Sequence, residues 1–179
     1  MKRKEGYLLL ESIISLSVIL IIISILYYLL FFSYNTKLKL EDKVELQQQA
    51  NEMSRYIEDI VGDSKGVISI NSKDLNYGDT IIDATSIKCK YKNEVNSIKD
   101  KEISLKKNLN KLFINNLSNS GASEQGGYEI GDYIDNMYVS VYEKGKFIKI
   151  TLALSKNNEK LQTEFKVNIR NFEGEQIWE

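Results

Sequence analysis

The 179-residue sequence contains no histidine, no proline and a single cysteine, Cys89. Without histidine, the chain lacks the usual general base, the usual activator of a serine or cysteine nucleophile, and the commonest metal ligand. One cysteine cannot form an intramolecular disulfide or the spaced set that binds zinc. Catalysis by carboxylates or lysines remains chemically open. The composition nevertheless argues against an enzyme, and we expect no catalytic residue, no cofactor and no metal site.

An excess of charge of one sign is also missing, because 24 basic and 25 acidic side chains leave a formal net charge of −1. Nucleic-acid-binding proteins usually carry a marked positive excess, so nucleic acid is not an expected partner. The length allows one ordinary domain together with an anchor or a tail. Packing, rather than cross-links, must stabilise that domain.

A long uncharged stretch covers residues 12–32, where 15 of the 21 residues are Ile, Leu, Val or Phe. As an α-helix it would extend about 32 Å, which matches the hydrocarbon core of a bilayer. Lys2, Arg3 and Lys4 precede it, so the positive-inside rule places the N-terminus in the cytoplasm and residues 35–179 outside. A cleavable secretory signal would have a shorter apolar stretch and then small residues. An uncleaved signal anchor fits the length and charge equally well.

Glu11 interrupts the apolar run that extends from Tyr7 to Ile14. A charged side chain in hydrocarbon costs about 2.5–3.5 kcal/mol at the bilayer centre and less toward its edge. An ordinary signal anchor gives no reason to accept that cost. Since ionisable residues inside membranes usually have a partner of opposite charge, the sequence predicts a cationic partner for Glu11.

The first eleven residues, MKRKEGYLLLE, resemble the N-terminal signature of type IV prepilins. That signature is a short basic leader ending in Gly, a bulky apolar residue after it, and Glu at the fifth mature position of a long apolar helix. The resemblance implies that a prepilin peptidase cuts between Gly6 and Tyr7 and methylates the new amine of Tyr7. It also implies that the subunit passes from membrane lipid, through an inner-membrane assembly platform, into a cell-surface filament of other pilin or pseudopilin subunits.

Cleavage would create a positive amine on Tyr7, and simple electrostatics supports a pair between this amine and Glu11. Opposite unit charges about 4 Å apart attract by about 4 kcal/mol at an effective dielectric constant of about 20. If the amine belongs to a neighbouring subunit, the pair fixes the axial register of two helices. Gly6 suits the position before the cut, because a residue without a side chain enters a protease site without a clash.

Residues 37–61 have apolar side chains at steps of mostly three and four, which predicts an amphipathic helix. The predicted buried stripe consists of Leu40, Val44, Ala50, Met53, Ile57, Ile60 and Val61. Gly62 suits a left-handed helix end.

Short runs at residues 66–71, 80–83 and 86–91 predict strands, and residues 121–131 predict a loop. Residues 92–120 fit a strand pair, a helix around residues 109–117 or an irregular segment.

Alternating apolar and polar residues predict three strands at residues 134–143, 146–154 and 161–172, which form an antiparallel meander. We therefore expect a pilin-like α+β fold, in which a long N-terminal helix packs on an antiparallel β-sheet. The predicted segments are a basic leader at 1–6, a transmembrane and filament-core helix at 7–34, an amphipathic continuation at 35–62 and an extracytoplasmic β-rich domain at 63–179.

The pattern of residues 134–172 also resembles the globular end of minor pseudopilins of the J type and minor pilins of the W type. Many pilins have a proline in or after the membrane helix, and many major pilins have a C-terminal disulfide loop. This chain can have neither. The resemblance therefore implies a minor subunit, whether of a pilus, a type II secretion pseudopilus or a competence filament.

Three further groups of side chains invite comparison with ligand sites. Glu129, Asp132 and Asp135 lack the spacing of a calcium loop, Tyr138 and Tyr142 share a strand face, and a basic region extends from Lys99 to Lys111. Each pattern is more typical of a solvated or packing surface than of a binding site.

The alternatives to a filament subunit are a signal-anchored extracytoplasmic domain that binds a ligand or partner without entering a filament, and a surface enzyme.

Overall fold

The structure is a computed structural model that describes residues 2–72, 81–91 and 98–173, with side chains from Tyr7 onward. The chain begins with helix α1 (Lys2–Gly62), and strands follow it. It divides into two compact units, Met1–Glu41 and Asp42–Glu179, which are described separately. We call them unit 1 and unit 2.

Unit 1 is helical because its sequence contains nothing that breaks a helix after Gly6. No proline or further glycine occurs before Gly62, and a regular hydrogen-bond ladder satisfies the backbone of the apolar residues that dominate the segment. The hydroxyls of Ser12, Ser17 and Ser24 donate to carbonyls three or four residues earlier, each at 2.8 Å. These bonds satisfy the serine side chains within the helix itself.

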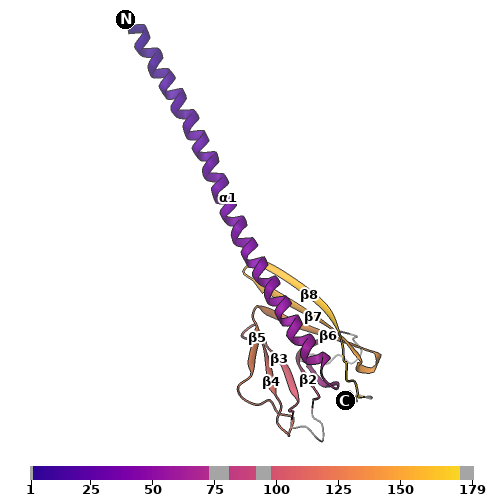
Figure 1. Ribbon diagram of the computed structural model, residues 1–179. Coiled ribbons are helices and arrows are strands. Elements are labelled where there is room, and N and C mark those ends of the chain that lie inside the picture. Colours follow the sequence, from indigo (N-terminus) through magenta and orange to yellow (C-terminus); the bar gives the residue numbers. More distant parts are fainter. Residues whose placement is uncertain (1, 73–80, 92–97, 174–179) are drawn as a thin grey trace. The chain divides into compact units, whose positions relative to one another are not determined.

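Unit 2 combines the last turns of α1 with one curled antiparallel sheet of eight strands (Figure 1). The strands are β1 (Val67–Ser72), β2 (Ile82–Cys89), β3 (Lys101–Lys106), β4 (Lys111–Asn116), β5 (Tyr128–Gly131), β6 (Ile134–Tyr142), β7 (Phe147–Lys156) and β8 (Glu159–Asn168). Their order is β5-β4-β3-β2-β6-β7-β8, and β1 also pairs with β2. β2 joins the two halves, since Ile82 and Asp83 pair with β6 whereas residues 86–89 pair with β3.

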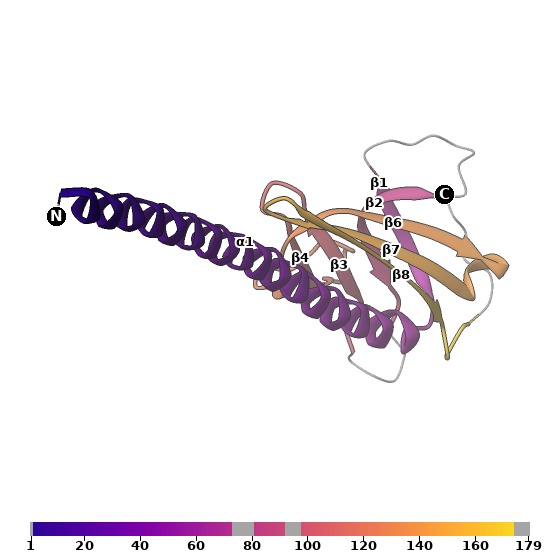
Figure 2. The same ribbon diagram turned by 90° about the horizontal axis from the view of Figure 1, so that it is seen from above.

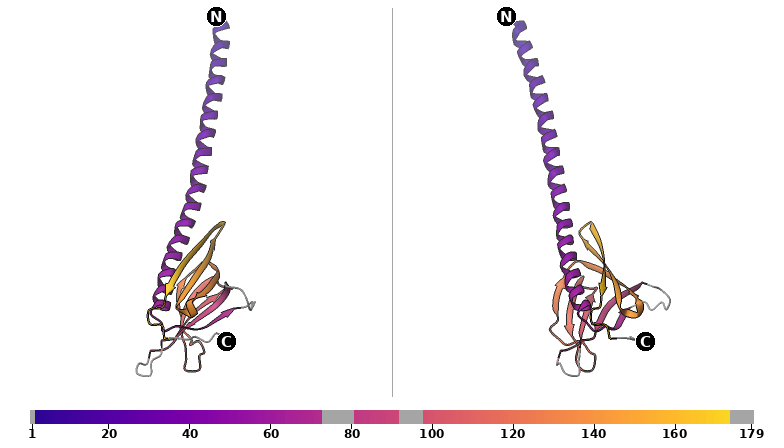
Figure 3. Two further views of the ribbon diagram at one scale, coloured as in Figure 1. Left: turned by 90° about the vertical axis from the view of Figure 1, so that its right-hand side faces the viewer. Right: turned by 45° about the vertical axis from the view of Figure 1, so that its right-hand side comes forward.

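The core lies between the sheet and one face of α1. The last helical turns have β3, β4 and β5 on one side and β6, β7 and β8 on the other (Figure 1), and Figures 2 and 3 give further views. The buried helical side chains are Leu46, Ala50, Met53, Ile57, Ile60 and Val61. β5 approaches the helix so closely that a Cβ added to Gly131 would collide with the Met53 side chain.

The predicted α+β fold class is confirmed, as are the three strands of the meander, with small shifts at their ends. β8 begins at Glu159 and ends at Asn168, earlier than the predicted strand at 161–172. For residues 92–120, the strand pair is the correct alternative, because β3 and β4 form a hairpin and no helix covers residues 109–117. Residues 92–97 of that region and Thr80 of the preceding run lie outside the described residues.

The separation of two strand runs and the extent of one loop were predicted wrongly. Residues 82–83 and 86–89 of the two predicted runs belong to the single strand β2, since Ala84 between them is fully buried and pairs with Ser72 of β1. The predicted loop at 121–131 ends in strand β5, which pairs with β4. β5 has only four residues, and two glycines precede it. A short strand next to turn residues gives too little alternation to be recognised.

The predicted stripe on the helix was also partly wrong. Leu40 and Val44 are exposed, and Leu46, which the prediction omitted, is buried. Leu46, Ala50, Met53, Ile57 and Ile60 follow one another at alternating steps of four and three. Val44 lies about 200° around the helix from Leu46, because each residue turns about 100°. The left-handed backbone also comes later than predicted, at Gly66 with φ of 147° rather than at Gly62.

Candidate functional site

The apolar half of α1 is the first candidate site. Its large apolar side chains from Tyr7 to Tyr34 are exposed around the whole helix. A helix that is apolar on every side is stable only in lipid or against other apolar surfaces. By length and composition this helix can cross a membrane, which is consistent with a single-pass anchor.

The predicted site residues Gly6, Tyr7 and Glu11 all lie in this helix. α1 begins at Lys2, so the Gly6–Tyr7 peptide bond is within helical backbone. Tyr7 and Glu11 are exposed and lie about one turn, or roughly 6 Å, apart along the axis. Among the side chains that the structure describes, none pairs with the Glu11 carboxylate. Cleavage, methylation of Tyr7 and pairing of Glu11 involve other molecules, and they stay predictions.

The helical setting gives Gly6 a second expected role. Cleavage between Gly6 and Tyr7, which stays a prediction, would require α1 to unwind at this bond, because a protease binds an extended segment. Glycine in a helix interior is about 1 kcal/mol less favourable than alanine. Gly6 would therefore ease unwinding as well as fit the protease site.

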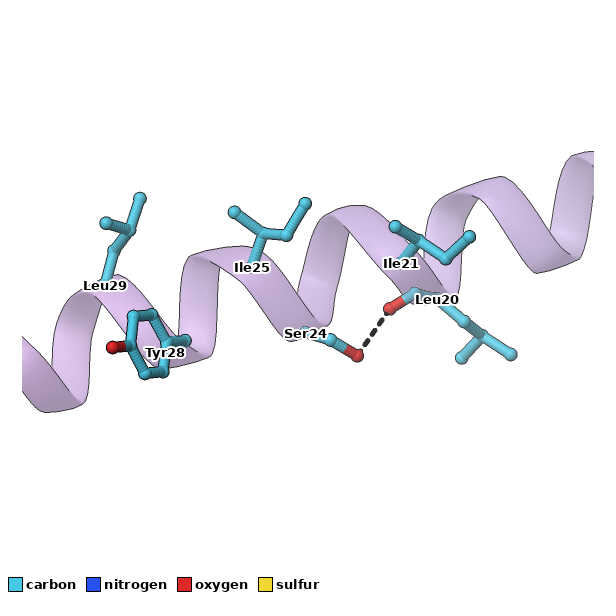
Figure 4. Close-up of a pocket in the computed structure, with 6 residues that line it drawn as sticks. All are labelled: Leu20, Ile21, Ser24, Ile25, Tyr28 and Leu29. Atoms are coloured by element: carbon cyan, nitrogen blue, oxygen red, sulfur yellow. Dashed lines mark hydrogen bonds between the residues drawn. The ribbon is translucent and has the colours of Figure 1, made fainter.

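A shallow hollow lies farther along the same helix, lined by Leu20, Ile21, Ser24, Ile25, Tyr28 and Leu29. Figure 4 shows the short Ser24 side chain donating its hydrogen bond back to the Leu20 carbonyl, while longer side chains flank it. One helix face cannot enclose a small ligand. A short residue between long ones instead allows the close approach of another helix, as at helix contacts in membranes.

A polar cluster in unit 2 fastens the helix to the β7–β8 turn. The Lys156 ammonium lies 2.5 Å from the Glu45 carboxylate and 3.2 Å from that of Asp42. The Tyr133 hydroxyl donates to Glu45 at 2.9 Å, and the Asn157 amide donates to Asp42 at 2.8 Å. We call these five residues the Lys156 clamp. It anchors the helix at the point where unit 2 begins.

Charge and hydrogen bonding shift the acid–base equilibria of the clamp. The Lys156 ammonium, followed by the Tyr133 hydroxyl, lowers the pKa of Glu45. The Asn157 amide and then Lys156 lower the pKa of Asp42 against the opposing effect of desolvation. In return, the bond to Glu45 raises the pKa of Lys156 and of Tyr133. The clamp is thus held together by the charged forms of both carboxylates.

We expect acid to loosen the clamp. A carboxylate whose pKa is lowered by folding contributes its stability above its unfolded pKa, here about 4, and loses it as the pH falls through its folded pKa. Amide hydrogen exchange of residues 42–49 in the full chain, corrected for intrinsic rates, should therefore accelerate below about pH 4. A Lys156→Met variant should lose most of this pH dependence. An unchanged pH profile in that variant would contradict the assignment.

Cys89 is fully buried in the core, where desolvation, together with the nearby Asp100 carboxylate, raises its pKa to about 12. The thiolate is the reactive form, so at pH 8 its population should be roughly a thousandfold lower than that of an exposed cysteine. We expect a maleimide to leave the folded chain unmodified and to label it fully in denaturant, as measured by intact mass. Labelling of the folded chain at the rate of a free thiol would show that the core is open.

Three of the five lysines in the basic region predicted between Lys99 and Lys111 form ion pairs with carboxylates. Its ion pairs join Lys99 to Glu124 at 2.6 Å, Lys107 to Asp83 at 2.8 Å, and Lys111 to Glu129 at 2.8 Å and to Asp132 at 3.3 Å. Lys111 thus lies between two of the three carboxylates of the predicted acidic stretch, and Asp135 accepts a hydrogen bond from Asn110. In the described parts of the chain, no cluster of acidic, cysteine or histidine side chains could hold a metal ion.

Sequence reasoning missed the Lys156 clamp entirely. Its members come from α1, the residue before β6, the end of β7 and the β7–β8 turn, and no spacing in the sequence relates them.

No protein-family model matches this chain, and neither a curated protein nor a solved structure matches it significantly. The molecule itself has a long apolar N-terminal helix packed on an antiparallel sheet, which is a pilin-like architecture.

Proposed function

We propose that the chain is a minor pilin or pseudopilin, which enters a type IV pilus-like filament after cleavage between Gly6 and Tyr7 and methylation of Tyr7. One observation carries the proposal. Glu11 stands alone as a charged residue between Tyr7 and Tyr34 of a helix whose apolar side chains are exposed on every side, five residues after Gly6. A cationic amine created by cleavage gives that carboxylate its partner.

The division of α1 between the two units supports this function. In unit 2, one face of the helix is covered by the sheet, and the Lys156 clamp fixes its start. In unit 1, the apolar surface has no cover within the described chain. Removing such a surface from lipid is favourable only if other apolar helices replace the lipid. The proposed partners are therefore a prepilin peptidase, the assembly platform and the helices of other pilin-like subunits.

Intact-mass measurement of the chain extracted from its native membrane tests the proposal. The expected mass lacks residues 1–6 and includes one added methyl group. A Gly6→Leu variant should insert equally well and keep the full mass, because a large side chain before the cut blocks the protease. A full-length mass for the natural chain would contradict the proposal and leave a signal-anchored extracytoplasmic binding domain.

A second measurement addresses the filament itself. The processed chain should be present in filaments sheared from the cell surface, in a small ratio to a more abundant subunit. Processed chain that remains in the membrane fraction under conditions where filaments form would argue against incorporation. The same ratio would separate a minor subunit from a major one.

A further inference from the structure

A hollow of about 820 Å³ lies beside β1 and β2 in unit 2, and the proposed function uses none of its residues. It is lined by Ile68, Ser69 and Lys88 of these strands and by two segments, residues 98–100 and 117–121. Its volume is within the range of pockets that hold small molecules. We call it the Lys88 hollow.

The loop after β4 forms an ordered wall of the Lys88 hollow. Its backbone closes a turn, since the Ser118 N–H donates to the Ala122 carbonyl at 2.8 Å and the Gly121 N–H donates to the Ser118 carbonyl at 2.9 Å. The Ser123 hydroxyl donates to the carboxylate of Glu102 in β3, which is buried. These bonds hold the wall against the sheet, so the hollow is part of the fold.

Lys88 supplies a half-buried positive charge to the hollow. It lies directly opposite Glu102 in the register of β2 and β3, where opposite charges usually pair. The Glu102 carboxylate instead accepts hydrogen bonds from Ser123 and Asn115, and the Lys88 ammonium donates to the Gly121 carbonyl at 2.9 Å. No carboxylate of the described residues forms an ion pair with Lys88. An ammonium has three donors, so two remain for an anion.

The other charged residues that line the hollow already have partners. The Lys99 ammonium pairs with the Glu124 carboxylate at 2.6 Å, and the Asp100 carboxylate accepts a hydrogen bond from the Tyr91 backbone N–H at 2.7 Å. The charge left to a ligand is therefore the single positive charge of Lys88. A ligand with one negative charge suits it better than a dianion, which the Asp100 carboxylate would repel.

The uncharged lining combines hydroxyl and amide groups with aliphatic side chains. Ile68 and Ile98 are 42% and 50% exposed, so a ligand that covers them removes apolar surface from water. A sugar ring matches this mixture, because it carries hydroxyls around its edge and C–H groups on its faces. The polar lining groups belong to Ser69, Ser118, Asn119 and Ser120.

We propose that the Lys88 hollow binds an acidic sugar residue, a pyranose that carries one carboxylate. Lys88 binds the carboxylate, the serine hydroxyls and the Asn119 amide bind the sugar hydroxyls, and Ile68 and Ile98 contact a C–H face of the ring. The site goes beyond the proposed function and does not depend on it, because it lies within unit 2 and needs neither cleavage nor filament entry. The sugar can be free or part of a polysaccharide, and the test separates these two sources.

Protection of the buried Cys89 thiol measures binding to the full-length chain in detergent micelles. Cys89 follows Lys88 on β2, so an opening that exposes the thiol to maleimide also disrupts the hollow. A ligand that binds only the folded form slows labelling by a factor of one plus the ratio of its concentration to its Kd, which is about tenfold at nine times Kd. Subdenaturing urea keeps the labelling rate measurable.

Two matched sugars test the chemistry of the site. Methyl β-D-glucuronide should slow labelling, and methyl β-D-glucoside, which has a hydroxymethyl group in place of the carboxylate, should bind about tenfold or more weakly, because it lacks the charged hydrogen bond. Acetate and inorganic phosphate at the same ionic strength should protect little. A glucuronate-containing tetrasaccharide that binds more tightly than the single sugar would identify a polysaccharide as the source, and equal binding would identify a free sugar.

Three variants test the assigned residues, each compared with its own sugar-free labelling rate so that changes in stability cancel. Lys88→Met should weaken glucuronide binding about tenfold or more and leave glucoside binding unchanged. Lys90→Met, an exposed lysine that does not line the hollow, is the matched control and should change neither. Ile98→Ser should weaken both sugars by a similar factor, because it removes apolar contact and no charge.

Several outcomes would overturn the proposal. Equal protection by the glucuronide and the glucoside would show that the charge of Lys88 is not used, and this comparison needs only the natural chain. Protection by acetate or phosphate as strong as that by the glucuronide would show a simple anion site. Lack of protection by either sugar at its highest soluble concentration would show that the hollow binds neither. Unchanged glucuronide binding by the Lys88→Met variant would exclude Lys88 as the partner of the carboxylate.

Discussion

Replacing Glu11 with alanine is expected to leave membrane insertion intact and to lower the amount of processed chain in filaments about a hundredfold or more. Insertion is spared because removing a charge from an apolar helix only favours the bilayer. Incorporation falls because the methylated amine of a neighbour would be buried without a counter-charge, at a cost of about 3–5 kcal/mol. The ratio of filament to membrane fractions, measured by quantitative immunoblotting, gives the result.

A Glu11→Gln variant provides the matched control for shape. Glutamine keeps the size and hydrogen-bonding capacity of glutamate but has no charge, so it should fail almost as severely as alanine. Near-normal incorporation of the glutamine variant would mean that shape or hydrogen bonding, rather than charge, makes Glu11 necessary. Intact mass should show normal cleavage in both variants, which separates an assembly defect from a processing defect.

The sequence was most informative where the relevant residues are neighbours in the chain. The apolar run of α1 needs only a residue count to match a bilayer. Gly6, Tyr7 and Glu11 also form one local pattern, whose role stays a prediction. The meander of β6, β7 and β8 was predictable for the same reason, because tight turns join strands that alternate clearly. Strands that follow one another in the chain pair with each other in the sheet.

Non-local contacts were not predictable in this way. The junction of β2 with β6, the pairing of β5 with β4 and the Lys156 clamp all join segments that are distant in the chain. The lysines that lie over the rings of Tyr142 and Phe147 show the same limit. Tyr138 and Tyr142 were seen to share a strand face, but Lys146 and Lys166 join Tyr142 and Phe147 only through the register of three strands.

The error in the helical stripe has a measurable consequence. Leu46 is 1% exposed, whereas Val44 is 48% exposed. Truncating a fully buried leucine to alanine costs about 2–5 kcal/mol, because transfer energy is lost and a cavity remains. Truncating an exposed valine on a helix changes the free energy of unfolding by only about 0.5 kcal/mol. We therefore expect Leu46→Ala to destabilise unit 2 severely and Val44→Ala to have little effect.

Cys89 provides the measurement for this pair of variants. The Cys89 thiol is buried in the core of unit 2. Maleimide labelling of the full-length chain at increasing denaturant concentration therefore reports the unfolding of unit 2. Leu46→Ala should shift the labelling midpoint to clearly lower denaturant, and Val44→Ala should leave it close to that of the natural chain. The reverse result would mean that α1 is rotated by about 200° and that the stripe predicted from the sequence faces the sheet.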